Sequence, residues 1–158
     1  MNEFKDKKLL LVDDDPAVRE SLAHVLTSEG YAVLTASNGV EALEVTTQHP
    51  VDLVLLDLNL PKKNGWDTFE LMIKQNPQLP VIIITARPNQ LFPALASGAG
   101  ALMEKPLDFP KLLQTIHDLL SEPVAARVAR LVGKPAEFHY MPSHSENFPE
   151  EDRGKPGS

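Results

Sequence analysis

The sequence KLLLVDDDP, residues 8–16, joins an apolar run directly to three carboxylates and a proline. Residues 8–12 have the length and the unbroken hydrophobicity of a strand that is covered on both faces. The pair Asp15-Pro16 is typical of a helix start, with a capping carboxylate before a proline in the first turn. We therefore expect a buried strand that ends in acidic residues and is followed at once by a helix.

The same alternation of strand and helix continues through residue 121. The apolar runs predict strands at Lys8–Val12, Tyr31–Thr35, Val51–Leu56, Val81–Thr85 and Gly100–Glu104. The segments between them predict helices at about Pro16–Glu29, Gly39–Gln48, Gly65–Asn76, Pro88–Ser97 and Asp108–Ser121. Pro88 and Pro93 predict that the fourth helix is irregular or short, starting near Phe92, because an interior proline removes a helical hydrogen bond. Strict alternation predicts an α/β fold, a parallel sheet with helices on both faces.

Composition excludes several classes of protein. The chain has 158 residues, of which 42% are hydrophobic, which is enough for a packed core. It has no cysteine, which excludes disulfides and thiolate metal sites and favours a reducing compartment, the cytoplasm. We expect no membrane span and no secretory signal, since the apolar runs are only strand-sized. The net charge of −7 disfavours non-specific binding to DNA.

Chemically useful side chains follow the strand ends, where ligands bind in parallel α/β sheets. If the first and third strands are neighbours, Asp13, Asp14 and Asp57 crowd one pocket, which is costly unless a cation or a proton intervenes. Oxygen ligands of this kind suit Mg²⁺. Thr85 and Lys105 end or follow the next strands, and a hydroxyl with an ammonium can hold a phosphoryl group. Asp57 is then the best nucleophile.

Five motifs carry a family resemblance: LLVDDDP at 10–16, LLDLNLP at 55–61, Gly65, ITA at 84–86 and EKP at 104–106. In this order and spacing they resemble response-regulator receiver domains over about residues 6–121. The resemblance implies a flavodoxin-like, doubly wound, five-stranded parallel sheet in the order 2-1-3-4-5. It also favours a cis bond between Lys105 and Pro106.

The resemblance further implies a phosphorylation-dependent switch of bacterial two-component signalling, and not an enzyme that turns over an outside substrate. Asp57 matches the residue that accepts a phosphoryl group from a sensor histidine kinase or a histidine phosphotransfer protein. Asp13, Asp14, Asp57 and the backbone carbonyl of Asn59 match the Mg²⁺ ligands. Thr85 and Lys105 match the pair that reads the phosphoryl group.

One part of the body departs from the family pattern. Three residues before the lysine, receivers usually carry Tyr or Phe as a switch together with Thr85, and here the residue is Leu102. The stretch from Thr85 to Leu102 also looks shorter than usual and contains the two prolines. Both changes fall on the face through which receivers commonly signal, so the output mechanism does not follow from the resemblance.

Residues 122–158 form a C-terminal extension of different character, rich in proline, serine and charge. It predicts a short helix within 123–132, with the rest flexible or docking on the body or a partner. A DNA-binding helix-turn-helix is disfavoured, because the tail supplies only one candidate helix, with Arg127, Arg130 and Lys134 as its basic residues. A homodimer and the downstream effector stay open. The alternative function is a binding scaffold that uses the receiver fold and the tail without phosphorylation.

Overall fold

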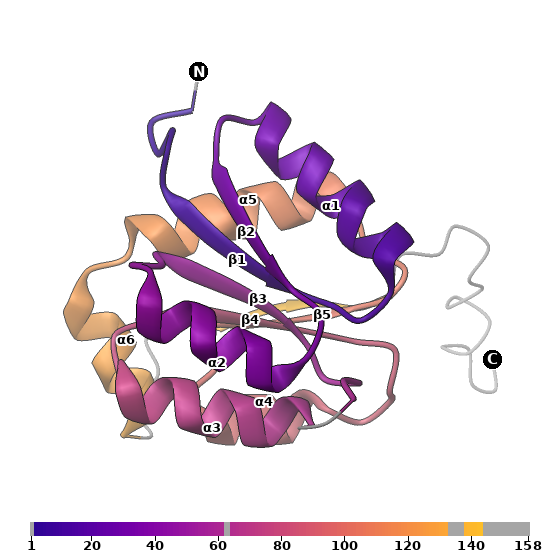
Figure 1. The fold of residues 1–158 in the computed structure, drawn as a ribbon. Coiled ribbons are helices and arrows are strands. Elements are labelled where there is room, and N and C mark those ends of the chain that lie inside the picture. The colour runs from indigo at the N-terminus through magenta and orange to yellow at the C-terminus, as the bar shows by residue number, and fades with distance from the viewer. Residues whose placement is uncertain (1, 62–63, 133–137, 144–158) are drawn as a thin grey trace, which may run out of the picture.

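The computed structural model describes residues 2–61, 64–132 and 138–143, and Figure 1 shows their arrangement. The elements in chain order are β1 (Lys8–Val12), α1 (Pro16–Ser28), β2 (Ala32–Ala36), α2 (Gly39–Gln48), β3 (Leu53–Asp57), α3 (Gly65–Gln75), β4 (Val81–Thr85), α4 (Leu91–Ser97), β5 (Ala101–Glu104), α5 (Phe109–Ser121), α6 (Val124–Leu131) and β6 (His139–Met141). The alternation of strand and helix that the sequence predicts is confirmed through α5.

The strands form one parallel sheet in the order β2-β1-β3-β4-β5-β6. The predicted order 2-1-3-4-5 is confirmed, but the sheet has six strands where we expected five. The sixth strand, His139–Met141, has three residues and lies in the extension. A strand this short at the edge of a sheet has no long apolar run, so its sequence resembles that of a loop. The remaining tail residues, for which we expected flexibility, lie outside the described part of the chain.

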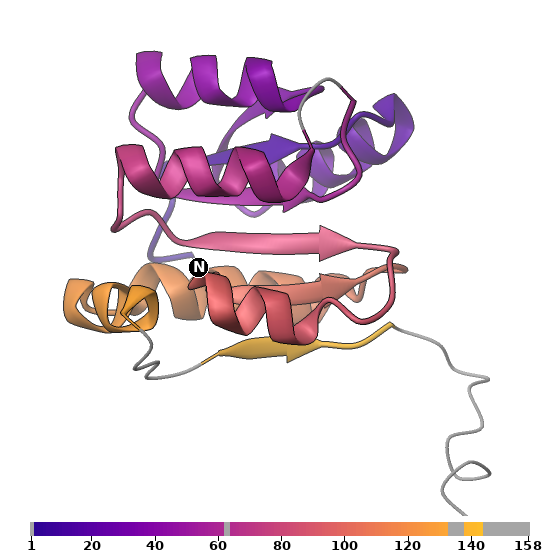
Figure 2. The same ribbon diagram turned by 90° about the horizontal axis from the view of Figure 1, so that it is seen from below.

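Helices cover both faces of the sheet, as Figures 1 and 2 show. Alternate residues of β1 point into different clusters, because side chains in a strand alternate between faces. Leu9 and Leu11 pack with α1 and α5, whereas Leu10 and Val12 pack with α2, α3 and α4. Within the described ranges, no helix is long and apolar enough to cross a membrane.

The helix starts follow the capping signals in the sequence. The Asp15 carboxylate accepts the backbone N–H of Ala17 at 2.9 Å and so caps α1. By contrast, α4 has seven residues and lacks a side-chain cap, which confirms the prediction of a short fourth helix. It ends at Gly98, whose φ of +89° suits glycine.

The extension first forms α6, inside the segment for which a short helix is predicted. A Cβ atom at Gly98 would lie 2.5 Å from Leu131 Cδ2, so α6 packs closely on the end of α4. Arg130 is only 4% exposed and donates from Nη1 to Glu122 Oε2 at 2.8 Å. Arg127 Nη2 donates to the Leu119 carbonyl at 3.1 Å. Arg127 therefore fixes α6 to the end of α5, and Arg130 fixes α6 to the residue that follows α5.

Candidate functional site

The strand register brings the predicted site residues to one edge of the sheet. Asp57 pairs with Ile84, and Thr85 pairs with Glu104, so β3, β4 and β5 end close together. Asp13 follows β1, which lies beside β3, and its N–H donates to the Ala36 carbonyl of β2. Parallel strands thus carry residues that are distant in sequence to a common carboxyl edge.

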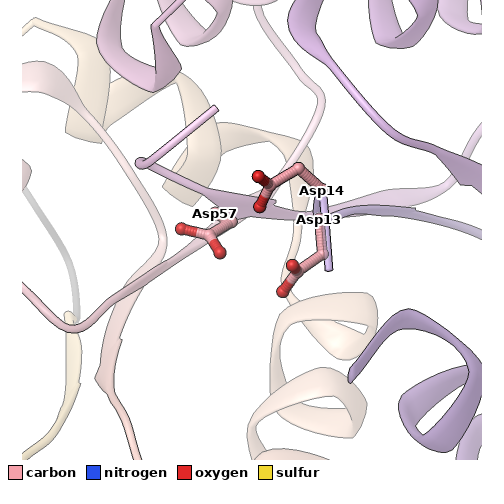
Figure 3. A group of neighbouring side chains, drawn as sticks. All are labelled: Asp13, Asp14 and Asp57. Carbon is pink, nitrogen blue, oxygen red and sulfur yellow. The ribbon is translucent and has the colours of Figure 1, made fainter. Parts of the chain in front are cut away.

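Three carboxylates meet at this edge, as Figure 3 shows. Asp13, Asp14 and Asp57 each offer an oxygen atom that lies within 4.8 Å of the other two. Asp13 is 1% exposed and Asp57 is 3% exposed, whereas Asp14 is open to solvent. Two buried carboxylates and an exposed one therefore form a compact acidic cluster that a cation can reach.

Lys105 supplies the positive charge on the inner side of the cluster. Its Nζ lies 2.8 Å from Asp57 Oδ2 and 3.5 Å from Asp13 Oδ2. Burial by itself lowers the pKa of Lys105, but the hydrogen bond and charge of Asp57, with those of Asp13, outweigh burial and raise this pKa. The lysine is therefore held as an ammonium against Asp57. Its bond to Pro106 is cis, as the resemblance favours.

Only one of the two oxygens of the Asp13 carboxylate accepts a hydrogen bond from the described residues. Its Oδ1 accepts the backbone N–H of Asp15 at 2.9 Å. Its Oδ2 is buried and makes no hydrogen bond with the described residues, although it lies 3.5 Å from the Lys105 ammonium. Burial raises the pKa of Asp13 and the charge of Asp57 adds to this rise, although the Asp15 N–H and Lys105 act in the opposite direction. A buried carboxylate oxygen of this kind, beside two further carboxylates, fits a hard cation such as Mg²⁺.

The loop after Asp57 is folded tightly around that residue. The backbone N–H of Asn59 donates to Asp57 Oδ1 at 2.9 Å, which holds the carboxylate from the side opposite Lys105. Gly65 donates its N–H to the Leu58 carbonyl at 3.0 Å. A Cβ atom at Gly65 would lie 2.4 Å from Leu58 Cα, so only glycine allows α3 to start this close to the loop. The role of the Asn59 carbonyl as a metal ligand stays a prediction.

Thr85 and Leu102, the two predicted switch residues, occupy different surroundings. The Thr85 side chain is fully buried, and its hydroxyl accepts the N–H of Arg87 at 2.8 Å. The Thr85 carbonyl accepts the N–H of Lys105 at 2.9 Å, which joins the ends of β4 and β5. Leu102 is fully buried in the apolar cluster under α2, α3 and α4. Leu102 is thus a core residue, whereas Thr85 adjoins the acidic cluster.

The sequence interpretation missed two sets of contacts at this edge. Arg19 of α1 donates from Nη1 to the backbone carbonyl of Asp13 at 2.7 Å. Its position one helical turn after the Asp15 cap was the available clue, because such a side chain can reach back to the strand end. The other set joins Ser143 of the tail to Glu104 and Lys105, and no sequence pattern indicates it.

The sheet order and the acidic cluster at its carboxyl edge define the class of protein. The model of the response regulator receiver domain matches residues 9–117, and the chain belongs to this family. Over 124 residues it is 40% identical to the transcriptional regulatory protein GlrR of Escherichia coli K12, covering 77% of this chain and 28% of GlrR. Over 115 residues it is 36% identical to the response regulator MprA of Mycobacterium leprae, covering 72% of this chain and 50% of MprA. The chain thus spans between about a quarter and a half of these curated relatives.

Solved structures agree with this assignment. The CheY-like receiver domain protein from Methanospirillum hungatei superposes with a TM-score of 0.70 at 31% identity, covering 73% of this chain and 94% of that one. The response regulator TrrA of Thermotoga maritima, solved in complex with Mg²⁺ and BeF, superposes with a TM-score of 0.67 at 32% identity, covering 72% and 98%. Receiver domains are signalling modules and not classical enzymes.

Proposed function

We propose that this chain is a phosphorylation-dependent switch that accepts a phosphoryl group on Asp57. The donor is a phosphohistidine of a sensor histidine kinase or a histidine phosphotransfer protein. The observation that carries the proposal is the 2.8 Å contact between Lys105 Nζ and Asp57 Oδ2 inside the three-carboxylate cluster. The domain division is part of the proposal, with the receiver at 6–121 and the extension at 122–158. So is a cytoplasmic location, which rests on the family.

Asp57 is suited to act as the nucleophile. A carboxylate oxygen of Asp57 forms the new bond to phosphorus while the phosphorus–nitrogen bond of the phosphohistidine breaks, and the electron pair stays on the imidazole. The backbone N–H of Asn59 and the ammonium of Lys105 fix the carboxylate from two sides. Phosphoryl transfer depends mainly on such positioning and on charge stabilisation.

The neighbouring groups are suited to hold the product. Lys105 is a fixed ammonium beside the reacting carboxylate. The Thr85 hydroxyl uses a lone pair to accept the N–H of Arg87, so its own proton is available for a phosphoryl oxygen. Asp13, Asp14, Asp57 and the Asn59 carbonyl are the proposed ligands of Mg²⁺. When bound, Mg²⁺ supplies the positive charge that neutralises the carboxylates and the phosphoryl oxygens.

The alternative, a scaffold that works without phosphorylation, is not favoured. A scaffold has no need for two buried carboxylates that pair with a lysine, because burying charge is costly. The same geometry is what an aspartyl phosphate requires. Homodimer formation and the downstream effector are not specified by the site.

A direct test exposes the full chain to Mg²⁺ with beryllofluoride, or to a small acyl phosphate donor. We expect the wild-type protein to bind beryllofluoride and to gain one phosphoryl group by mass spectrometry. Asp57→Asn should do neither. The control is Asp118→Asn on α5, an exposed carboxylate that accepts from Gln114. Failure of the wild-type protein, or modification of Asp57→Asn equal to that of the wild type, contradicts the proposal.

A further inference from the structure

The tail strand β6 covers the outer edge of β5. His139, Tyr140 and Met141 lie in parallel register beside Ala101–Met103. The N–H of His139 donates to the Gly100 carbonyl at 3.3 Å. Figure 2 shows β6 in yellow, extending the sheet beyond β5. The edge that a five-stranded receiver would leave open is thus filled by the chain's own extension.

The side chains of β6 make specific contacts on both faces of the sheet. Met141 is 6% exposed and packs with α5, where Thr115 Oγ1 donates to its Sδ at 3.2 Å. On the other face, the Tyr140 hydroxyl donates to Glu104 Oε2 at 3.1 Å. Phe138 packs against the cluster that contains Leu102. The β5 edge therefore recognises side chains as well as backbone, as strand-addition sites do.

Ser143, just beyond β6, links the tail to the functional edge. Its N–H donates to Glu104 Oε1 at 3.2 Å, and its hydroxyl donates to the backbone carbonyl of Lys105 at 3.0 Å. Lys105 is thus held at its carbonyl by the tail and at its ammonium by Asp57.

The tail also shares a cavity with the residues that follow Thr85. A hollow of about 610 Å³ is lined on one side by residues 86–92 and on the other by Glu104, Lys105, Tyr140 and Ser143. The wall formed by residues 86–92 includes Arg87, whose N–H is bound to the Thr85 hydroxyl. The tail therefore borders both segments that reach the phosphorylation site.

We infer that the β5 edge is a binding site for the extended tail peptide 138–143, and that docking of this peptide and occupation of the Asp57 site by a phosphoryl group strengthen each other. The inference rests on the proposed function for its second half. The physical reason is that Ser143 fixes the backbone of the residue whose ammonium must contact the phosphoryl group. By thermodynamic linkage, the occupied site then favours the docked strand to the same extent. Ser143 is thus a positioning residue that acts through Lys105.

The occupant is the tail of the same chain. Leu131 packs on Gly98, next to the start of β5, and only residues 132–137 separate α6 from the docked segment 138–143. So short a connection keeps the peptide at a high effective concentration beside its site. Exchange of tails between two copies is the competing arrangement, and protein concentration distinguishes the two.

The test uses the full chain and three variants. Ser143→Ala removes the hydroxyl that holds Lys105, Ser143→Thr keeps a hydroxyl, and Ser121→Ala is the matched control. Ser121 donates to the His117 carbonyl on α5 and has no contact with the site among those given by the structure. Calorimetry measures beryllofluoride affinity in Mg²⁺, and hydrogen exchange measures protection of the β6 amides with and without beryllofluoride.

We expect Ser143→Ala to weaken beryllofluoride binding about threefold, the scale of one hydrogen bond that is only partly coupled to the site. Ser143→Thr should restore the affinity, and Ser121→Ala should leave it unchanged. Beryllofluoride should slow exchange of the wild-type β6 amides by about the same factor. A purely structural role of Ser143 would change exchange but not the affinity.

The outcomes separate the two proposals. If the wild type binds beryllofluoride, but Ser143→Ala binds equally well and β6 exchange does not respond, the coupling is wrong and the proposed function stands. If the wild type does not bind, the proposed function and the coupling both fail. If the β6 amides of the free protein are not protected from hydrogen exchange, docking itself is wrong. If their protection rises with protein concentration, the docked tail belongs to a second copy.

Discussion

Replacing Asp13 with Asn should stabilise the protein in the absence of Mg²⁺ and remove the stabilisation that Mg²⁺ brings. Asp13 is 1% exposed, and one of its oxygens is buried without a hydrogen-bond partner among the described residues. The amide side chain keeps an acceptor for the Asp15 N–H. It also gains a donor for the Asp57 carboxylate, which lies within 4.8 Å.

The magnitude follows from opposing charges. At an effective dielectric constant of ~20, the Asp57 carboxylate, within 4.8 Å, repels Asp13 by at least ~3.5 kcal/mol, and the Lys105 ammonium at 3.5 Å attracts it by ~4.7 kcal/mol. These two effects nearly cancel, so burial decides the sign, in agreement with the raised pKa of Asp13. We expect a gain of about 1–2 kcal/mol, the usual penalty of a buried polar group without a partner.

The effect depends on pH in a definite direction. Because the folded state raises the pKa of Asp13, protonated Asp13 contributes stability below its unfolded pKa of about 3.8. This contribution is lost as the pH rises through the raised pKa. The difference between Asp13→Asn and the wild type should therefore be largest at neutral pH and vanish in acid.

Urea unfolding measures both effects. With a slope of about 2 kcal/mol per molar urea, the variant's midpoint in a chelator at pH 7 should exceed that of the wild type by roughly 0.5–1 M. Mg²⁺ at ten times its dissociation constant should stabilise the wild type by about 1.4 kcal/mol and the variant by much less. A lower midpoint for the variant in chelator, or equal responses to Mg²⁺, would refute the reasoning. Asp118→Asn controls for loss of a carboxylate elsewhere.

Two further predictions follow from the described contacts. Gly65→Ala places a Cβ atom 2.4 Å from the backbone Cα of Leu58 and should cost roughly 1–3 kcal/mol in thermal unfolding. Gly100→Ala should cost less, because its Cβ atom would have no contact closer than a flexible Leu119 methyl group at 3.0 Å; equal costs would contradict the close approach of the loop. Burial, with the hydrogen bond and charge of Glu104, raises the pKa of Tyr140 above 10.0. The contribution of Tyr140 to β6 docking is therefore fully present below pH 10 and is lost as the pH rises through the raised pKa. In a Tyr31→Phe background, Tyr140 is the only tyrosine, so an absorbance titration reports on it alone. The midpoint should lie above 10.0 and should fall when Glu104→Gln is added; an unchanged midpoint would contradict the contact between Tyr140 and Glu104.

The buried strands were predictable because their sequences leave little choice. The strand Val81–Thr85 is apolar through Ile84, and its predicted and observed bounds agree. β3 instead begins two residues later than predicted and includes Asp57. The reason is tertiary: Asp52 pairs with Lys8 before the strand begins, and Asp57 pairs with Ile84 as the strand ends. The hydrophobicity of the sequence predicts neither of these two contacts.

The acidic cluster was predictable because it depends on topology and on strand ends, both of which the sequence indicates. The tail was not. The sequence analysis named Arg130 only as a basic residue of the predicted helix, but Arg130 is buried against Glu122, two positions before α6 begins. Tyr140 and Ser143 contact residues about 37 positions earlier in the chain, and such partners have no fixed spacing in sequence.

The parallel direction of β6 determines at which edge of the sheet the described part of the tail ends. A receiver that stopped at α5 would release its chain at the amino edge of the sheet, because α5 runs back from the strand ends. Here α6 turns the chain round and β6 carries it across the sheet again, so that Ser143 reaches Lys105. The described tail therefore ends at the phosphoacceptor edge, where Ser143 is bound to the residue whose ammonium contacts Asp57.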